Sequence, residues 1–171
     1  MSEMSLGKDD APVVMVEYSS LGCPHCAAFH RDTLPKIKTE YIDRGKVKLI
    51  LHDFPLGTPA MAAAMVARCA GRERYFGFVE ILFRSQAQWA QNNDPLAAIA
   101  RVVRFGGMTE ADVDACLKYQ PLLEYVRKGA DTAHEKLKIN STPTFMIGNE
   151  KIVGAAPYED FKKAIDRALK K

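Results

Sequence analysis

Hydrophobic and polar positions in the first third of the chain follow strand and helix periods in turn. Residues 13–18 form a short β-branched run that ends in turn signals and predicts a buried strand. Residues 24–44 have a helical pattern, with a bend expected at Pro35 and an end at Gly45. Residues 46–52, "KVKLILH", predict a second strand. A strand, a helix and a strand of these lengths predict a right-handed βαβ unit with parallel strands.

The pattern changes at Thr58, where a long segment rich in Ala, Met and Leu at helical spacing begins. Thr58 is expected to cap the first helix of this segment, with Pro59 at the first helical position. Further helix starts are predicted at the Asp-Pro pair of residues 94–95 and at Thr109, which is followed by acidic residues. Residues 58–119 are therefore predicted to form an all-helical block.

Strands return in the last third of the chain. After a helix predicted over residues 121–138, the segments "TPTFMIG" and "KIVG" flank the turn "GNEK", which indicates a β-hairpin. A terminal helix is predicted over residues 158–168. The whole pattern predicts an α/β fold in which residues 1–57 and 120–171 form one discontinuous domain and the helical block is an insertion.

Composition narrows the class of protein. The chain has 171 residues, of which 47% are hydrophobic and 26% charged, as in an ordinary globular protein. Its net charge is only +3 and its basic residues are scattered, which argues against a nucleic-acid partner. Residues 1–10 are polar and do not resemble a signal peptide. We therefore expect either a cytosolic protein or a sequence that starts at the mature end of an exported one.

The candidate chemistry lies in the motif Cys23-Pro24-His25-Cys26. Proline at the first helical position puts Cys23 at the N-cap and Cys26 one turn further along the same face. Unpaired backbone N–H groups and the helix dipole stabilise a thiolate there, and such thiols titrate at about 3.5 to 7.5. His25, between the cysteines, is expected to stabilise the same anion. A stabilised thiolate favours the dithiol, which makes the disulfide an oxidant.

Other uses of a CxxC pair are less well supported. A zinc site needs a second pair, but Cys69 and Cys116 are far apart and each has a helical pattern around it. A soft metal such as copper, held with His25, His30 or a methionine, remains an alternative. A purely structural bridge is disfavoured because a two-residue loop removes little chain entropy. We favour a redox pair that needs neither a metal nor a cofactor.

With CPHC, three further features resemble the DsbA family of the thioredoxin superfamily: the segment "HDFPL" (residues 52–56), the helical insertion and the loop "STPTF" (residues 141–145), in the same order. The resemblance covers nearly the whole chain and implies a thioredoxin-like fold with a helical insertion domain. It also implies that Cys23 attacks substrate and Cys26 resolves the mixed disulfide. Thr142 and Pro143 match the loop whose cis proline faces the cysteines and whose preceding residue pairs its backbone with bound peptide.

Glu17 interrupts an otherwise apolar strand, and an unpartnered buried carboxylate costs several kcal/mol. The resemblance implies that it exchanges a proton with Cys26 through water, although an acid at a strand end that reaches solvent is the alternative. His52 could share this relay or be an ordinary polar residue, and His30 and His134 carry no comparable argument. The resemblance also allows a bridge between the remaining pair, Cys69 and Cys116, worth about 4 kcal/mol; two buried free thiols are the alternative.

We therefore predict a periplasmic, monomeric DsbA-like thiol:disulfide oxidoreductase that donates the Cys23/Cys26 disulfide to reduced, unfolded secreted proteins. Its expected reoxidant is a quinone-linked membrane partner similar to DsbB. The first alternative is a disulfide isomerase or reductase, which usually needs a dimerisation domain or a reducing partner, and the chain shows no spare segment for such a domain. The second is a non-catalytic thiol that binds a metal such as copper.

Overall fold

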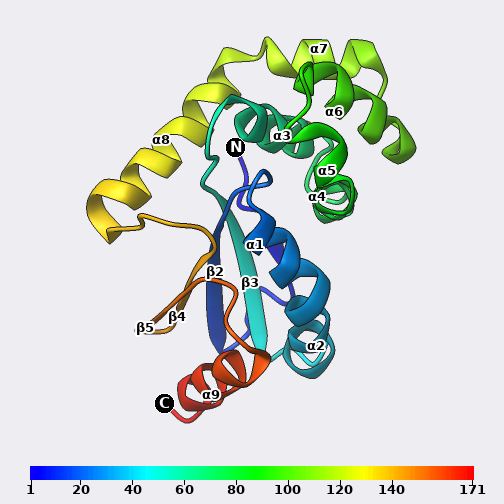
Figure 1. Ribbon diagram of the computed structural model, residues 1–171. Helices are drawn as coiled ribbons and strands as arrows, with labels where there is room; N and C mark the ends of the chain where they lie inside the picture. The colour runs from blue at the N-terminus through cyan, green and yellow to red at the C-terminus, as the bar shows by residue number, and fades with distance from the viewer.

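The computed structural model describes residues 1–171 and has a mixed α/β fold built on one five-stranded sheet (Figure 1). The strand order is β1-β3-β2-β4-β5. The parallel pairing of β2 with β3 and the hairpin of β4 with β5 confirm the sequence predictions, whereas β1, which pairs antiparallel with β3, was not predicted. The strands are β1 (Ser5–Leu6), β2 (Val13–Ser19), β3 (Val47–Asp53), β4 (Thr144–Ile147) and β5 (Glu150–Val153).

Helices α3 to α7 lie together beyond the carboxyl ends of β2 and β3, and α8 runs back from them toward the sheet (Figure 1). None of the helices combines the length and the apolar content needed to cross a membrane. The α-helices are α1 (Pro24–Ala28), α2 (Leu34–Ile37), α3 (Thr58–Cys69), α4 (Tyr75–Arg84), α5 (Gln86–Trp89), α6 (Pro95–Val103), α7 (Glu110–Leu117), α8 (Gln120–Leu137) and α9 (Tyr158–Leu169).

The first helical stretch does not have a single regular geometry. Two π-helical segments, η1 (Phe29–Thr33) and η2 (Lys38–Ile42), alternate with α1 and α2. Pro35 has no N–H to donate to the carbonyl of Arg31, and its ring crowds that carbonyl, so the helix widens just before the proline. The bend expected at Pro35 therefore takes the form of a π segment. Gly45, at φ +70°, follows the end of η2 as predicted.

Two helix caps predicted from the sequence are present in the structure. Asp94 accepts a hydrogen bond from the backbone N–H of Ala97, and Thr109 forms a capping box at the start of α7. The prediction for α3 was wrong by one residue, because Thr58 is the first helical residue and Gly57 is the N-cap. Gly57 has φ +89°, a conformation that glycine adopts far more readily than threonine.

The core has two main apolar clusters that meet near α1. One lies between the sheet, the first helical stretch and α9, where Phe29 packs against Phe145 with ring centroids 4.5 Å apart. The other lies under the helices of residues 58–117 and includes Cys26 and Leu51. Burying a large apolar side chain in either cluster stabilises the fold by about 1.5–3 kcal/mol. The candidate cysteines therefore sit where the two clusters adjoin.

A buried ion pair holds the helices against the end of β3. Asp53 is 4% exposed, pairs with Arg68 of α3 and accepts a hydrogen bond from the Tyr75 hydroxyl at 3.2 Å. Arg68 also donates to the carbonyl of Ser2 at 3.1 Å. Removing either charge would leave the other buried and uncompensated, at a cost of about 3–5 kcal/mol. This pair therefore fixes α3 relative to the strand that borders the candidate site.

Candidate active site

The start of α1 presents the two cysteines as predicted. Cys23 is the N-cap with an extended backbone (φ −86°, ψ 121°), and Pro24 occupies the first helical position, where its fixed φ fits the helix. Both cysteines are free thiols in this structure. Cys23 is 8% exposed and Cys26 is fully buried. The two sulfurs thus differ in their access to solvent although only two residues separate them.

The surroundings of Cys23 stabilise its thiolate. A hydrogen bond from the Cys26 thiol lowers the pKa of Cys23 to about 5, helped by the Thr142 side chain and by the backbone N–H groups of Cys26 and His25, while burial opposes the change. The protonated Cys23 thiol donates to the Thr142 carbonyl at 3.4 Å. His25 was expected to act through its ring, but that ring is exposed and makes no hydrogen bond, so its contribution comes from the backbone.

Cys26 has the opposite tendency. Burial raises its pKa well above that of an ordinary thiol, and the hydrogen bond to Cys23 and the charge of Glu17 raise it further. At neutral pH Cys26 therefore keeps its proton while Cys23 loses it. The site holds one ready nucleophile and one thiol that reacts only when a base removes its proton.

Glu17 is fully buried on β2, which excludes the solvent-facing alternative. Its two carboxylate oxygens lie 3.1 and 3.0 Å from Nε2 of His30, whose side chain is 10% exposed. The sequence analysis gave His30 no role. A signal was present, because His30 follows Cys26 by four residues and so lies on the same side of the helical stretch.

The suggestion that His52 shares a relay with Glu17 was wrong. In the parallel pairing, Tyr18 lies opposite His52 and Glu17 opposite Leu51. Because side chains alternate along a strand, His52 points to the other face of the sheet. There its ring packs against that of Tyr18, with the ring centroids 4.9 Å apart. A Cβ atom added to Gly129 of α8 would lie 3.2 Å from that ring. His52 therefore fills the contact between β3 and α8.

The loop before β4 lies against Cys23. The Thr142–Pro143 peptide bond is cis, as the family resemblance implied, and Pro143 is buried. Thr142 makes no hydrogen bond between its own backbone and other backbone groups. From the helical side, the Gln86 side-chain amide donates to the carbonyls of Leu21 at 2.7 Å and Cys23 at 3.0 Å. No sequence pattern indicated this contact, which ties the helices of residues 58–117 to the segment that leads into α1.

The second cysteine pair forms a disulfide. Cys69 at the end of α3 and Cys116 in α7 are bonded, with their Cα atoms 6.1 Å apart and 47 positions between them in sequence. The alternative of two free buried thiols is therefore excluded. The bridge ties together two helices of residues 58–117 and takes no part in the contacts of Cys23.

Comparison with known proteins agrees with this geometry. A family model described as thioredoxin matches residues 1–167. The crystal structure of Wolbachia pipientis α-DsbA1 has a TM-score of 0.91 and 31% identity, covering 99% of this chain and 92% of that one. The chain belongs to the DsbA family of the thioredoxin superfamily. BdbD from Bacillus subtilis is similar in the same way, with a TM-score of 0.88, 28% identity and coverage of 99% and 94%.

Curated relatives of this DsbA-family chain carry related names. Disulfide bond formation protein D of Bacillus subtilis is 29% identical over 170 residues, which is 96% of this chain and 76% of that protein. A Rickettsia typhi protein named as a protein-disulfide oxidoreductase is 28% identical over 169 residues, or 98% of this chain. The chain spans 62% of the length of that Rickettsia relative.

Proposed function

We propose that this DsbA-family chain is a thiol:disulfide oxidoreductase that donates the Cys23/Cys26 disulfide to reduced, unfolded secreted proteins. The observation that carries the proposal is the opposite pKa tendency of two neighbouring sulfurs, with Cys23 lowered to about 5 and Cys26 raised. A stabilised Cys23 thiolate makes the dithiol form favourable and the disulfide a good oxidant.

The exchange conserves atoms and electrons. A substrate thiolate attacks Cys23 Sγ and breaks its bond to Cys26, which leaves as a thiolate and takes up a proton. A second substrate thiolate then attacks the substrate sulfur of the mixed disulfide, and Cys23 leaves as its stabilised thiolate. Two electrons pass from the substrate dithiol to the Cys23/Cys26 pair. Attack at Cys23 rather than Cys26 is supported by the complete burial of Cys26.

Glu17 is the proposed proton donor and acceptor for Cys26. Both groups are fully buried, and the Glu17 charge already raises the pKa of Cys26. As a carboxylic acid, Glu17 would supply the proton when Cys26 leaves, and as a carboxylate it would remove the proton when Cys26 attacks.

Thr142 and Pro143 are the proposed substrate-binding residues. Thr142 lies beside the Cys23 sulfur, and its main chain is not engaged with other backbone groups. An extended substrate segment could therefore pair its backbone with Thr142 while its cysteine reaches Cys23. Pro143 offers no N–H that would compete for the substrate or the sulfur.

The remaining parts of the proposal concern the setting of the reaction. We place the protein in the periplasm, as a monomer, with reoxidation by a quinone-linked membrane partner similar to DsbB. Residues 1–57 and 120–171 would form the thioredoxin-like domain, and residues 58–119 the insertion domain. Support comes from the family and from the bridged Cys69/Cys116 pair, since disulfides persist in oxidising compartments.

A refolding assay tests the activity. The oxidised protein is mixed with a reduced, unfolded substrate that contains several cysteines, and substrate thiols and recovered activity are followed with time. Oxidase activity predicts rapid loss of substrate thiols, one disulfide for each protein molecule. Faster rescue of a scrambled substrate than oxidation of a reduced one would favour an isomerase. Stoichiometric copper on the purified protein with no thiol exchange would favour the metal-binding alternative.

A further inference from the structure

The buried position of Cys26 raises the question of how its proton reaches water. Cys26 and Glu17 are both 0% exposed, so neither exchanges protons directly with solvent. The nearby Ser19 hydroxyl, which can donate a hydrogen bond to a Cys26 thiolate, is also buried. If Glu17 exchanges a proton with Cys26 in each cycle, Glu17 itself needs a partner that reaches solvent.

His30 has the contacts that such a partner requires. Its Nε2 lies within hydrogen-bond distance of both Glu17 oxygens. Its Nδ1 makes no hydrogen bond within the protein, and it is not one of the fully buried side-chain polar atoms that lack a partner. Nδ1 is therefore accessible to solvent. One imidazole ring thus joins the buried carboxylate to the surface, and imidazole accepts and releases protons near neutral pH.

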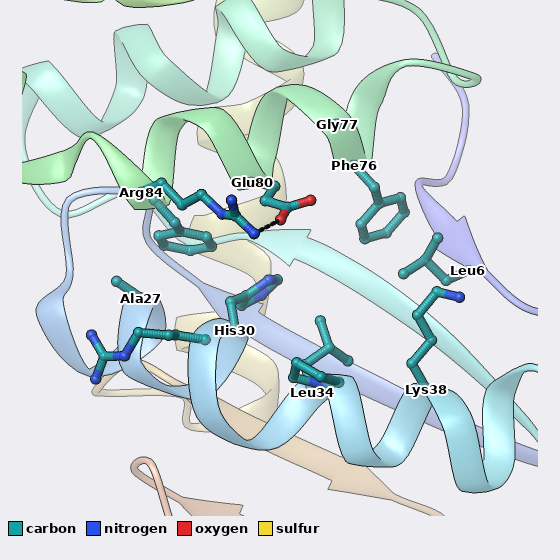
Figure 2. A pocket seen from close by; sticks show the side chains of 12 residues that line it. Leu6, Ala27, His30, Leu34, Lys38, Phe76, Gly77, Glu80 and Arg84 are labelled. Carbon is teal, nitrogen blue, oxygen red and sulfur yellow. Dashed lines mark ion pairs between the residues drawn. The ribbon is translucent and has the colours of Figure 1, made fainter.

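The accessible edge of His30 opens into a groove between the first helical stretch and α4 (Figure 2). The groove has a volume of about 660 Å³ and is lined on its apolar side by residues such as Leu6, Leu34 and Phe76. The ring of Phe83 packs on the imidazole with centroids 4.5 Å apart and fixes its orientation. Water in the groove can therefore meet His30 without reaching Glu17.

The charged groups that face the groove already have partners of their own. On α4, Glu80 is paired with Arg84, as Figure 2 shows. From the first helical stretch, Arg31 pairs with Asp32 and Lys38 with Asp43. None of these groups forms an ion pair or hydrogen bond with His30, whereas Glu17 contacts it through both carboxylate oxygens.

We propose that His30 carries protons between Glu17 and the water of this groove, and so completes a route from Cys26 to solvent. The inference rests on the proposed function. As Cys26 attacks Cys23 in a mixed disulfide, the Cys26 proton passes to Glu17, the new S–S bond forms and the bound thiol leaves as a thiolate. Nε2 of His30 takes the proton from Glu17, and Nδ1 releases a proton to the groove. Opening of the disulfide by substrate runs the same steps in reverse.

A single-turnover experiment tests this role. The protein, with Cys23 and Cys26 reduced and Cys69/Cys116 bridged, is mixed with excess oxidised glutathione, quenched in acid at set times and analysed by mass spectrometry. Attack by Cys23 gives the glutathione adduct, and closure by Cys26 removes it. We expect His30→Gln to slow closure near neutral pH by about tenfold, less than the roughly 10²-fold of a directly acting base. Attack by Cys23 should be unchanged, which also shows that the variant is folded.

Two controls separate proton transfer from a change in structure. His52→Gln removes a half-buried imidazole on the opposite face of the sheet and should leave closure unchanged. His30→Ala should recover closure with added imidazole but not with pyrazole, which has the same shape and is a far weaker base. The pH dependence of closure should also become flatter in His30→Gln.

The outcomes are distinct. Closure of His30→Gln at the wild-type rate across the pH range would overturn the proposal, as would equal slowing of attack and closure, or equal rescue by imidazole and pyrazole. If the wild-type protein forms neither an adduct at Cys23 nor a Cys23–Cys26 disulfide, the proposed oxidoreductase function itself fails, whatever His30 does.

Discussion

The two cysteine pairs of this chain lie in different surroundings, and only one of them is bonded in this structure. Cys23 and Cys26 are separated by two residues at a helix N-terminus and are free thiols. Cys69 and Cys116 are separated by 47 positions and are bonded. The residue type is the same in both pairs, so the difference comes from the length of chain that each bridge closes and from the groups around each sulfur.

Chain entropy and electrostatics act in opposite directions at the two places. A bridge that closes the 47-position separation restricts the unfolded chain and stabilises the fold by about 4 kcal/mol in the chain-entropy model. A bridge over two residues gains far less, and at Cys23 the lowered thiolate pKa favours the open form. One chain can therefore stabilise a disulfide at one pair of cysteines and the open form at another.

The largest effect should come from removing one member of the reactive pair. Cys23→Ser should lower oxidation of a reduced protein substrate by more than about 10³-fold, as expected when the attacking group of an enzyme is lost. The double variant Cys69→Ala/Cys116→Ala should keep turnover within a few-fold of the wild type. Loss of exchange in the double variant as complete as in Cys23→Ser would contradict these separate roles of the two pairs.

Removal of the Cys69/Cys116 bridge should lower the stability of the fold rather than the rate of exchange. Cys69→Ala/Cys116→Ala should lose about 4 kcal/mol of unfolding free energy, measured by denaturant unfolding with Cys23 and Cys26 in one defined redox state. Cys26→Ala, a matched loss of a buried sulfur without a long bridge, provides the control. An unchanged free energy of unfolding in the double variant would show that the bridge does not restrict the unfolded chain.

The redox state of Cys23 and Cys26 should change the free energy of unfolding by a smaller amount, and for this pair the open form should be the more stable one. A folded pKa lowered to about 5 gives the dithiol form stability that is fully present above the unfolded pKa and lost as pH falls through about 5. Near neutral pH the dithiol should be more stable than the disulfide form by roughly 2 kcal/mol, counting about 1.4 kcal/mol per pH unit above the folded pKa and allowing for solvent screening. Melting curves of the two forms should converge near pH 5. A disulfide form that melts higher at neutral pH contradicts this.

Gln86 should have the smallest effect, because it links the two regions through two hydrogen bonds to carbonyl groups. Gln86→Leu should cost about 1 kcal/mol of unfolding free energy, the usual net contribution of a hydrogen bond, because both contacts are only partly buried. Hydrogen exchange should speed up at the start of α1 and remain unchanged around the Cys69/Cys116 bridge. Equally faster hydrogen exchange in both places would mean that Gln86 supports the whole fold rather than the start of α1.

Local sequence patterns predicted most of the fold and the two reactive cysteines. A β-branched run predicted β2, a short apolar segment predicted β3, and the turn "GNEK" predicted the hairpin. Pro24 placed Cys23 at a helix N-cap. These features depend only on neighbouring residues. β1 was missed because two residues are too few to show a period. The π segments were missed because a proline predicts a distortion but not its form.

Contacts between distant elements were harder to predict. Glu17 and His30 meet only when β2 packs against the first helical stretch, and the Gln86 contact spans more than 60 positions. The face on which His52 lies depends on strand alternation and register, and the sequence analysis did not place it relative to Glu17. Sequence patterns therefore predicted the two reactive cysteines, whereas tertiary packing determines which groups contact them and change their pKa values.

Stabilisation of the Cys23 thiolate by the fold is measured by titration of the reduced active site. Thiolate absorbance in the ultraviolet is followed against pH for the protein with Cys69/Cys116 bridged, with Cys23→Ser as the blank. We expect a single thiolate that forms with a midpoint of about 5, while Cys26 stays protonated through neutral pH. A midpoint of about 8.5, as for a free thiol, would contradict it.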